Sequence, residues 1–168
     1  MIVSPPGWRG VGEGVSITEV EGAIGEAVYR TSCKALSLSG GIDSALLLHF
    51  MGEVFEGGII VGDGIDELMC GYYPHAKEPT EQVYQLYLRR LVVDHLKPLD
   101  RNSSGVRVHL PYLDSKVVAL CHRIPTYRKV SVGARKRLMF LMAERAGLPQ
   151  GLIHRRKYGF CDAGQIKG

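Results

Sequence analysis

The apolar residues of the chain fall first into a helical period. Between residues 20 and 28 they recur three and four positions apart, which predicts one buried helix face. Thr18 is a suitable cap for this helix, and Glu21 stands three residues later, as in a capping box. We therefore expect a helix that begins after Thr18 and runs to about Ser32.

Two short apolar runs follow, and both predict buried strands. Residues 33–38 form the first run and residues 58–61 the second, each beside glycines. Between them, residues 45–51 continue as a helix that ends near Gly52. The order of helix, strand, helix and strand is typical of an open layer of parallel strands and helices.

The second half of the sequence predicts helices. They cover residues 65–70, 80–96, 114–123 and 134–146. We expect an α/β fold with a small parallel sheet and a helical C-terminal part. Its domain organisation is predicted to be a loose N-terminal arm over residues 1–17, rich in proline and glycine, followed by one compact domain over residues 18–168.

Composition narrows the class of protein. The 168 residues are 45% hydrophobic and 23% charged, as in ordinary globular proteins. No apolar run approaches the roughly 18 residues of a membrane helix, and the first residues lack the zones of a secretory signal, so we expect a cytoplasmic protein away from membranes. The four cysteines form no C-x-x-C pair that would indicate a zinc site. A net charge of +4 fits a phosphate-binding protein as well as a nucleic-acid-binding one.

The loop after the first predicted strand carries the chemistry. Gly40 and Gly41 let the backbone approach a ligand closely, and a helix that starts here favours an anion. Ser39 and Ser44 add hydroxyl donors. Asp43 would repel a bare phosphate, and Mg²⁺ bound between carboxylate and phosphate resolves that conflict. The S-G-G tripeptide alone fits an ordinary turn equally well.

The whole loop, Ser39-Gly40-Gly41-Ile42-Asp43-Ser44, resembles the S-G-G-x-D-S pattern of the PP-loop ATP pyrophosphatases. It lacks the G-K-[ST] ending of a Walker A loop. The resemblance implies a Rossmann-like fold of the adenine nucleotide alpha hydrolase type. It also implies an enzyme that cleaves ATP between the α and β phosphates and releases pyrophosphate.

Three later stretches are similar to one branch of that group, the asparagine and β-lactam synthetases. Residues 62–73 resemble G-[ED]-G-x-D-E-x-x-G-G-Y, with Cys70 in place of the first paired glycine. Residues 99–114 resemble the segment that ends in P-F-L-D, and residues 135–160 resemble K-x-x-L-R through R-x-K-x-G-F. The motifs follow in the family's order.

The resemblance implies a role for individual residues at the phosphate site. Asp43 and Asp66 match the carboxylates that hold magnesium on the ATP phosphates. Gly62 and Gly64 join the phosphate-binding residues of the first loop. Such carboxylates bind the cation that carries the triphosphate.

Two further residues match catalytic positions. Lys157 matches the lysine whose charge offsets the negative charge that grows on the reacting oxygens. Asp63 falls where the family has an acidic or tyrosine residue near the acceptor, which implies a base or an amine-orienting group; a solvated turn aspartate is the equal alternative. The function implied is an asparagine-synthetase-like ligase that uses ATP and Mg²⁺ to join a small carboxylate to an amine.

The chain departs from this family in two respects. It shows no cysteine-opened glutaminase domain, so we expect ammonia to come from elsewhere. Only 17 residues separate Ser44 from Gly62, which predicts a sheet of two or three strands with exposed edges for a second copy or a partner subunit to cover. A non-catalytic nucleotide-binding module within a complex is therefore an alternative, and an RNA-modifying PP-loop enzyme is a second one that positive charge alone favours.

Overall fold

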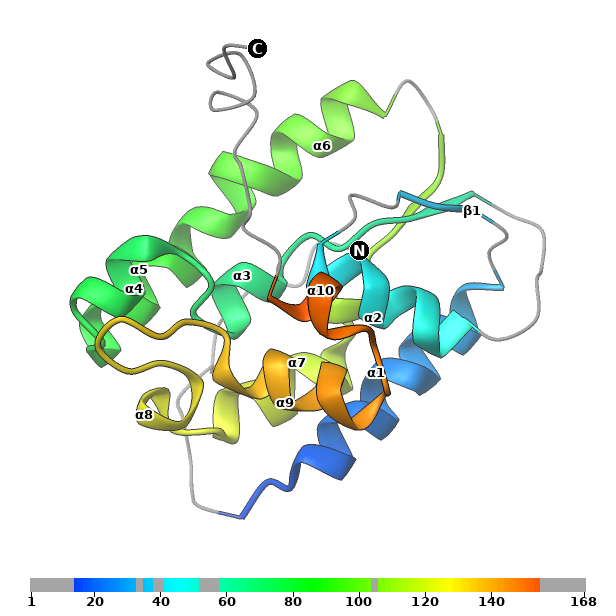
Figure 1. The fold of residues 1–168 in the computed structure, drawn as a ribbon. Helices are drawn as coiled ribbons and strands as arrows, with labels where there is room; N and C mark the ends of the chain where they lie inside the picture. The colour runs from blue at the N-terminus through cyan, green and yellow to red at the C-terminus, as the bar shows by residue number, and fades with distance from the viewer. Residues whose placement is uncertain (1–13, 33–34, 38–40, 52–57, 104–105, 155–168) are drawn as a thin grey trace, which may run out of the picture.

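The computed structural model describes residues 14–32, 35–37, 41–51, 58–103 and 106–154 (Figure 1). The strands are β1 (Ala35–Leu36), β2 (Ile59–Ile60) and β3 (Val108–His109). The α-helices are α1 (Ile17–Thr31), α2 (Ile42–Met51), α3 (Ile65–Leu68), α4 (Tyr73–Lys77), α5 (Glu81–Leu91), α6 (Lys97–Asn102), α7 (Ser115–Arg123), α8 (Thr126–Lys129), α9 (Arg137–Arg145) and α10 (Gln150–Ile153). A π-helical turn, η1 (Val92–Leu96), and a 3-10 turn, η2 (Pro111–Leu113), complete the set.

The strands form a small parallel sheet in the order β1-β2-β3. The amides of Ile59 and Val61 donate to the carbonyls of Arg107 and His109 at 2.9 and 3.0 Å, which fixes β3 against β2. The predicted α/β class, with a small parallel sheet and a helical C-terminal part, is confirmed. Since the strands are parallel, their carboxyl ends lie at one edge, where the loops to α2 and α3 begin.

Helix α1 begins two residues earlier than predicted. Ser16 is its cap: the Ser16 hydroxyl accepts from the amide of Glu19, and the Glu19 carboxylate accepts from the amide of Ser16. The prediction that Thr18 and Glu21 form the capping box is wrong. Both side chains instead bind Arg145, whose guanidinium donates to Glu21 at 2.9 Å and to Thr18 at 3.2 Å.

The long helix predicted over residues 80–96 is real, but it does not end there. Thr80 caps it, and it continues through η1 into α6. Within η1 the amide of Lys97 donates to the carbonyl of Val92, five residues back. Pro98 follows at once and has no N–H to donate, so regular α-helical bonding could not continue unchanged across this point.

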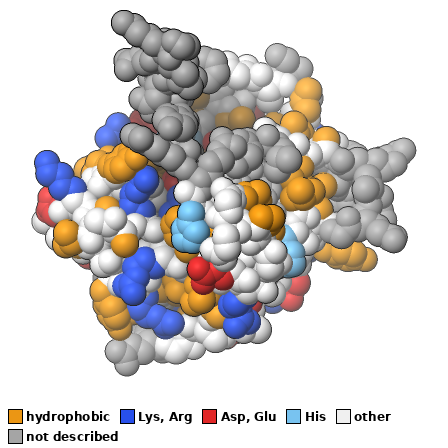
Figure 2. Space-filling model, in the orientation of Figure 1, with side chains coloured by type: hydrophobic (Ala, Val, Ile, Leu, Met, Phe, Trp, Pro, Cys, Tyr) orange, Lys and Arg blue, Asp and Glu red, His pale blue; other side chains and the backbone are white. Residues whose placement is uncertain are grey.

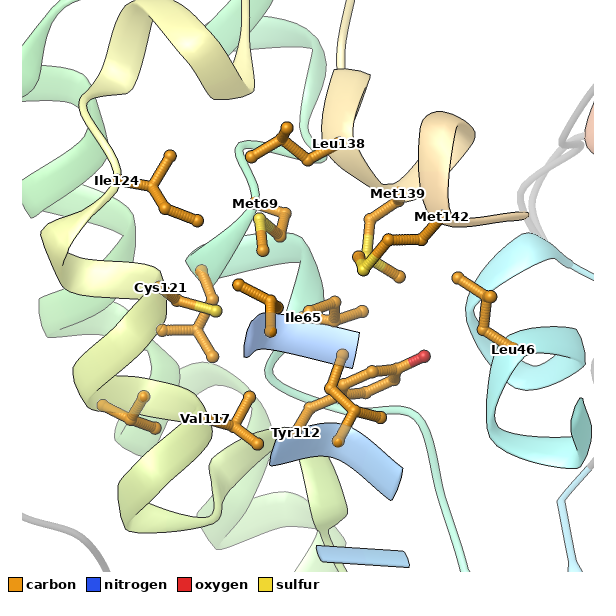
Figure 3. Packing of buried hydrophobic residues seen from close by; sticks show 14 of the residues in the cluster. Leu46, Ile65, Met69, Tyr112, Val117, Cys121, Ile124, Leu138, Met139 and Met142 are labelled. Atoms are coloured by element: carbon orange, nitrogen blue, oxygen red, sulfur yellow. The ribbon is translucent and has the colours of Figure 1, made fainter. Parts of the chain in front are cut away.

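The hydrophobic core lies between helices α1, α2, α7 and α9. Helix α1 packs against α2 and α7, and α2 packs against α9. Figure 3 shows Leu46 of α2 facing Met139 and Met142 of α9, while Val117 and Cys121 of α7 approach from the other side. Helix α7 is capped by Asp114, as predicted, and α9 begins only at Arg137 because a short bridge precedes it. This packing fixes the starts of α2 and α9 relative to each other.

Candidate functional site

The first predicted loop is described from Gly41 onward; Ser39 and Gly40 lie outside the described residues. The carbonyl of Gly41 accepts from the amide of Ala45 at 3.0 Å, which makes Gly41 the start of the first turn of α2. Ser44 is buried, and its hydroxyl donates to the same carbonyl at 3.1 Å. Within the protein, the Ser44 hydroxyl therefore stabilises the helix start.

Asp43 sits in this first turn, where a buried tyrosine holds the backbone. The hydroxyl of Tyr112 donates to the carbonyl of Asp43 at 2.7 Å. Figure 3 shows that hydroxyl pointing toward α2. Burial raises the pKa of Tyr112 well above its ordinary value, so the hydroxyl keeps its proton and remains a donor. The segment after β3 thereby positions the helix that carries Asp43.

The second loop brings Asp66 to the same place. It leads from β2 into α3, and Asp66 lies in the first turn of that helix. The Nζ atom of Lys136 lies 2.5 Å from Oδ2 of Asp43 and 2.6 Å from Oδ1 of Asp66. The carboxylates of Asp43 and Asp66, in the first turns of α2 and α3, thus converge on one cation. The residue at the point of convergence is a lysine.

Charge and burial oppose each other at Lys136. Burial by itself would lower the pKa of this ammonium, but the attraction of Asp43 and Asp66 outweighs burial and raises the pKa above its ordinary value. The side chains of Asp43 and Asp66 are only 14% and 21% exposed, so solvent screens their attraction weakly. Lys136 is a functional candidate that the sequence analysis did not assign, although it lies within residues 135–160, which resemble the family pattern.

The turn at Cys70 and Gly71 packs directly against the ion pair of Asp66 and Lys136. A Cβ atom on Gly71 would stand 1.7 Å from Oδ1 of Asp66 and 2.4 Å from Cε of Lys136, so only glycine fits. Arg135 donates to the carbonyl of Gly71 at 2.7 Å and holds the turn against the start of α9. Cys70 has a φ of 56°, a left-handed conformation that glycine adopts most easily. The left-handed backbone at position 70 and the lack of space at position 71 account for the two consecutive glycines of the family pattern, the first of which is Cys70 in this chain.

The remaining residues of the second loop surround the pair. A Cβ atom on Gly62 would lie 3.8 Å from Cβ of Asp43, so Gly62 runs beside the first loop. Gly64 has a φ of 93°, and a Cβ atom there would collide with Leu113. Asp63 is half-buried in the turn between them. Lys157 lies outside the described residues.

A second polar cluster adjoins Asp66; Glu67 and Tyr72 stand at specified positions of the second motif, but the sequence analysis gave them no role. Glu67 is 2% exposed and accepts from the hydroxyl of Tyr72 at 2.7 Å. Nε2 of His95, from the π-helical turn, lies 3.1 Å from the Tyr72 oxygen and 3.4 Å from Glu67. Burial raises the pKa of Glu67, and the hydrogen bond from Tyr72 opposes that shift. The cluster joins α3 to the long helix.

The donor set fits a magnesium ion held together with phosphate. Asp43 and Asp66 already converge on a cation, and hard oxygen ligands are those that Mg²⁺ prefers. Across the part of the chain that the structure describes, no group of three or more His, Cys, Asp or Glu side chains is placed to hold a metal. Two carboxylates suffice when phosphate oxygens and water supply the other ligands.

Elsewhere on the described part of the chain, we find no second candidate site to set beside the Asp43–Asp66 pair. A hollow of about 590 Å³ lies between α1, α6 and β3, and neither Asp43 nor Asp66 lines it. On the face in Figure 2, the Lys and Arg side chains of the described residues are interspersed with hydrophobic and acidic ones and form no continuous basic surface there. Among the helices that the structure describes, none has the length and apolar character needed to cross a bilayer.

Comparison with known proteins identifies a family. Residues 74–167 match the family described as asparagine synthase. The matched span includes Lys136 and Lys157 and begins after Asp43, Asp63 and Asp66. No curated protein matches the chain.

Proposed function

The chain belongs to the asparagine synthase family, which is matched over residues 74–167, and on that premise we propose that it is an amide-forming ligase dependent on ATP and magnesium. The family membership makes it part of a group of ATP-dependent amidating ligases. The finer proposal is that a small carboxylate is adenylated, pyrophosphate is released, and ammonia or another amine displaces AMP.

One observation carries this proposal. Asp43 and Asp66 lie at the starts of two helices that follow adjacent parallel strands, and both approach a single cation within 2.6 Å. Two carboxylates repel each other, and a pair held this close requires a cation or a shared proton between them; here a cation lies between them, as in a metal site. The carboxyl edge of a parallel sheet is also where ligands of such folds bind.

The site residues have distinct roles in this reaction. The first turn of α2, with Gly41 at its start, favours the triphosphate through the helix dipole. Asp43 and Asp66 would hold Mg²⁺, which when bound offsets phosphate charge and makes pyrophosphate a better leaving group. Gly62 and Gly64 keep the second loop close to the first.

The proposed reaction has two steps: adenylation of the carboxylate, and transfer of the acyl group to the amine. An oxygen of the substrate carboxylate bonds to the α phosphorus of ATP as the bond to the β-phosphate oxygen breaks, which gives an acyl-adenylate and pyrophosphate. The amine nitrogen then bonds to the acyl carbon, AMP leaves, and one proton leaves the nitrogen. We assign Asp63 to orienting the amine or taking that proton, and Lys157 to offsetting negative charge on the reacting oxygens.

The test is to incubate the protein with Mg-ATP, ammonia and a panel of amino-acid carboxylates. We expect AMP and pyrophosphate in equal amounts, detected by phosphorus NMR, together with an amide product. Asp66→Asn should abolish release of pyrophosphate. Asp94→Asn is the matched control, because Asp94 pairs with Arg90 at the surface and should not affect turnover. Turnover that survives Asp66→Asn would contradict the metal assignment.

The short sheet favours one other candidate. Only 17 residues separate Ser44 from Gly62, and within the described residues each strand of the sheet spans two residues. A nucleotide-binding module that works within a complex fits such a sheet, with a partner or a second copy at its edges. This candidate predicts that ATP binds and that no carboxylate in the panel yields pyrophosphate.

A further inference from the structure

The position of Lys136 points to a role that precedes nucleotide binding. Its ammonium lies 2.5 and 2.6 Å from the carboxylates of Asp43 and Asp66. These are the distances of close ion pairs, and the Lys136 side chain is only 8% exposed. The lysine therefore stands at the centre of the site rather than at its rim.

Three features show that this placement is built into the fold. Lys136 has a φ of 50°, a left-handed conformation that non-glycine residues seldom adopt. Gly71 packs so closely on Asp66 and on Cε of Lys136 that any side chain would displace them. Arg135, the preceding residue, is fixed by its hydrogen bond to the carbonyl of Gly71. The backbone conformation of Lys136, the close packing of Gly71 and the hydrogen bond of Arg135 together hold the ammonium beside the two carboxylates.

We propose that Lys136 is a positioning residue whose ammonium is a tethered substitute for the divalent cation, holding Asp43 and Asp66 together until metal and nucleotide arrive. The inference rests on the proposed function, since it assumes that these carboxylates bind magnesium. Without the ammonium, two poorly screened carboxylates would repel each other and separate. With the ammonium in place, the two carboxylates already lie close together before substrate binds.

The same contact makes the metal site selective for the metal–nucleotide complex. A free divalent ion must displace an ammonium that is attached to the protein and is always present. An ion that arrives with ATP brings phosphate oxygens as additional ligands, and its binding is correspondingly stronger. The additional phosphate ligands therefore couple the binding of metal to the binding of ATP, and the coupling is reciprocal.

The experiment measures Mn²⁺ binding by the EPR signal of the free ion, with and without ATP. Wild-type protein should bind Mn²⁺ weakly alone and much more tightly with ATP. Lys136→Met removes the competing charge, so it should bind Mn²⁺ alone about tenfold or more tightly than wild type does. Mn²⁺ should also raise the unfolding temperature of the variant more than that of wild type. Unchanged or weaker binding of Mn²⁺ alone to Lys136→Met overturns the proposal.

A matched control is Lys129→Met, which removes another buried lysine, one placed over the ring of Tyr84. It should leave Mn²⁺ affinity as it is in wild type. An equal gain in both variants would mean that net charge alone acts, and the proposal would be wrong.

A measurement on wild-type protein does not depend on how the variant folds. An amine-acylating reagent, with the modified residue located by mass spectrometry, should label Lys136 slowly without metal and faster when Mn²⁺ occupies the carboxylates. An unchanged rate at saturating Mn²⁺ contradicts the displacement. If wild-type protein binds no Mn²⁺ even with ATP, the proposed function itself fails; if it does bind but neither the variant nor the labelling responds, only the role of Lys136 fails.

Discussion

Two buried lysines in this protein have opposite surroundings. Lys136 is buried and faces the carboxylates of Asp43 and Asp66. Lys129 is fully buried; its Nζ atom lies 3.9 Å from the ring centre of Tyr84 and has no hydrogen-bond partner among the described residues. One ammonium is thus held by charge, and the other by the face of an aromatic ring.

The pKa values of the two lysines move in opposite directions. Burial lowers the pKa of Lys129, and the acidic groups around it offset the shift only in part. At Lys136 the two carboxylates outweigh burial and raise the pKa. Burial of a lysine is therefore no sign of function by itself. The informative feature is that the fold brings two carboxylates together at a sheet edge, where repulsion between them must be offset.

The largest expected effect comes from removing both carboxylates. Asp43→Asn combined with Asp66→Asn leaves the ammonium of Lys136 buried without a counter-charge, and the free energy of unfolding should fall by about 3 kcal/mol. Release of pyrophosphate should be lost as well. Urea unfolding and the phosphorus NMR assay measure the two results. A doubly substituted protein as stable as wild type would show that the two lysines do not differ as described.

The next effect is steric. Gly71→Ala places a methyl group against Asp66 and Lys136, so the free energy of unfolding should fall by about 2 kcal/mol. Gly22→Ala is the control, because a Cβ atom there meets nothing within 4 Å in helix α1, and this change should stabilise the protein by up to about 1 kcal/mol. If both changes have the same sign in urea unfolding, the close fit at Gly71 is refuted.

A smaller effect tests the aromatic partner of Lys129. Tyr84→Leu removes the ring face beneath the ammonium and should lower the free energy of unfolding by about 1 to 2 kcal/mol. Tyr84→Phe keeps the ring and removes a hydroxyl without a hydrogen-bond partner among the described residues, so its effect should stay below about 0.5 kcal/mol. Thermal unfolding of the two variants gives the comparison. Equal losses would mean that the ring face is not what holds the lysine.

The smallest effect is expected for Lys129 itself. Lys129→Met should leave stability at pH 7 within about 1 kcal/mol of wild type, because the lost ring contact is offset by the removal of a buried charge. The folded state lowers the pKa of Lys129, so the unfolded chain binds more protons between that lowered value and about 10.4, the ordinary value. Wild-type stability relative to the variant should therefore rise with pH through this window. A flat difference would contradict the lowered pKa.

The sequence predicted the local parts of this architecture better than the distant contacts. The strand–loop–helix order, the helix over residues 114–123 and its Asp114 cap depend on neighbouring residues, and the structure has them. The cap of α1 was misassigned because Ser16 with Glu19 and Thr18 with Glu21 have the same spacing. Thr18 and Glu21 are engaged instead by Arg145, which is 124 residues from Glu21 and which no local pattern could indicate.

The centre of the candidate site illustrates the same limit. The family resemblance and the loops after two strands indicated that Asp43 and Asp66 would meet. Neither of them predicted the contact of Lys136, which lies 93 residues from Asp43 and reaches it through the packing of α9 on α2. His95 is a second case, since its contact with Tyr72 depends on a π-helical turn that no local pattern marked.

That π-helical turn has a consequence for how the chain tolerates insertions and deletions. A π turn has one residue more than the α-helical turn it replaces, and each residue of an α-helix turns the following side chains by about 100°. Loss of one residue from η1 would remove the extra residue of the π turn and rotate everything after it, including all of α6. Length variation among related chains should therefore avoid η1 and gather in the loops that follow it.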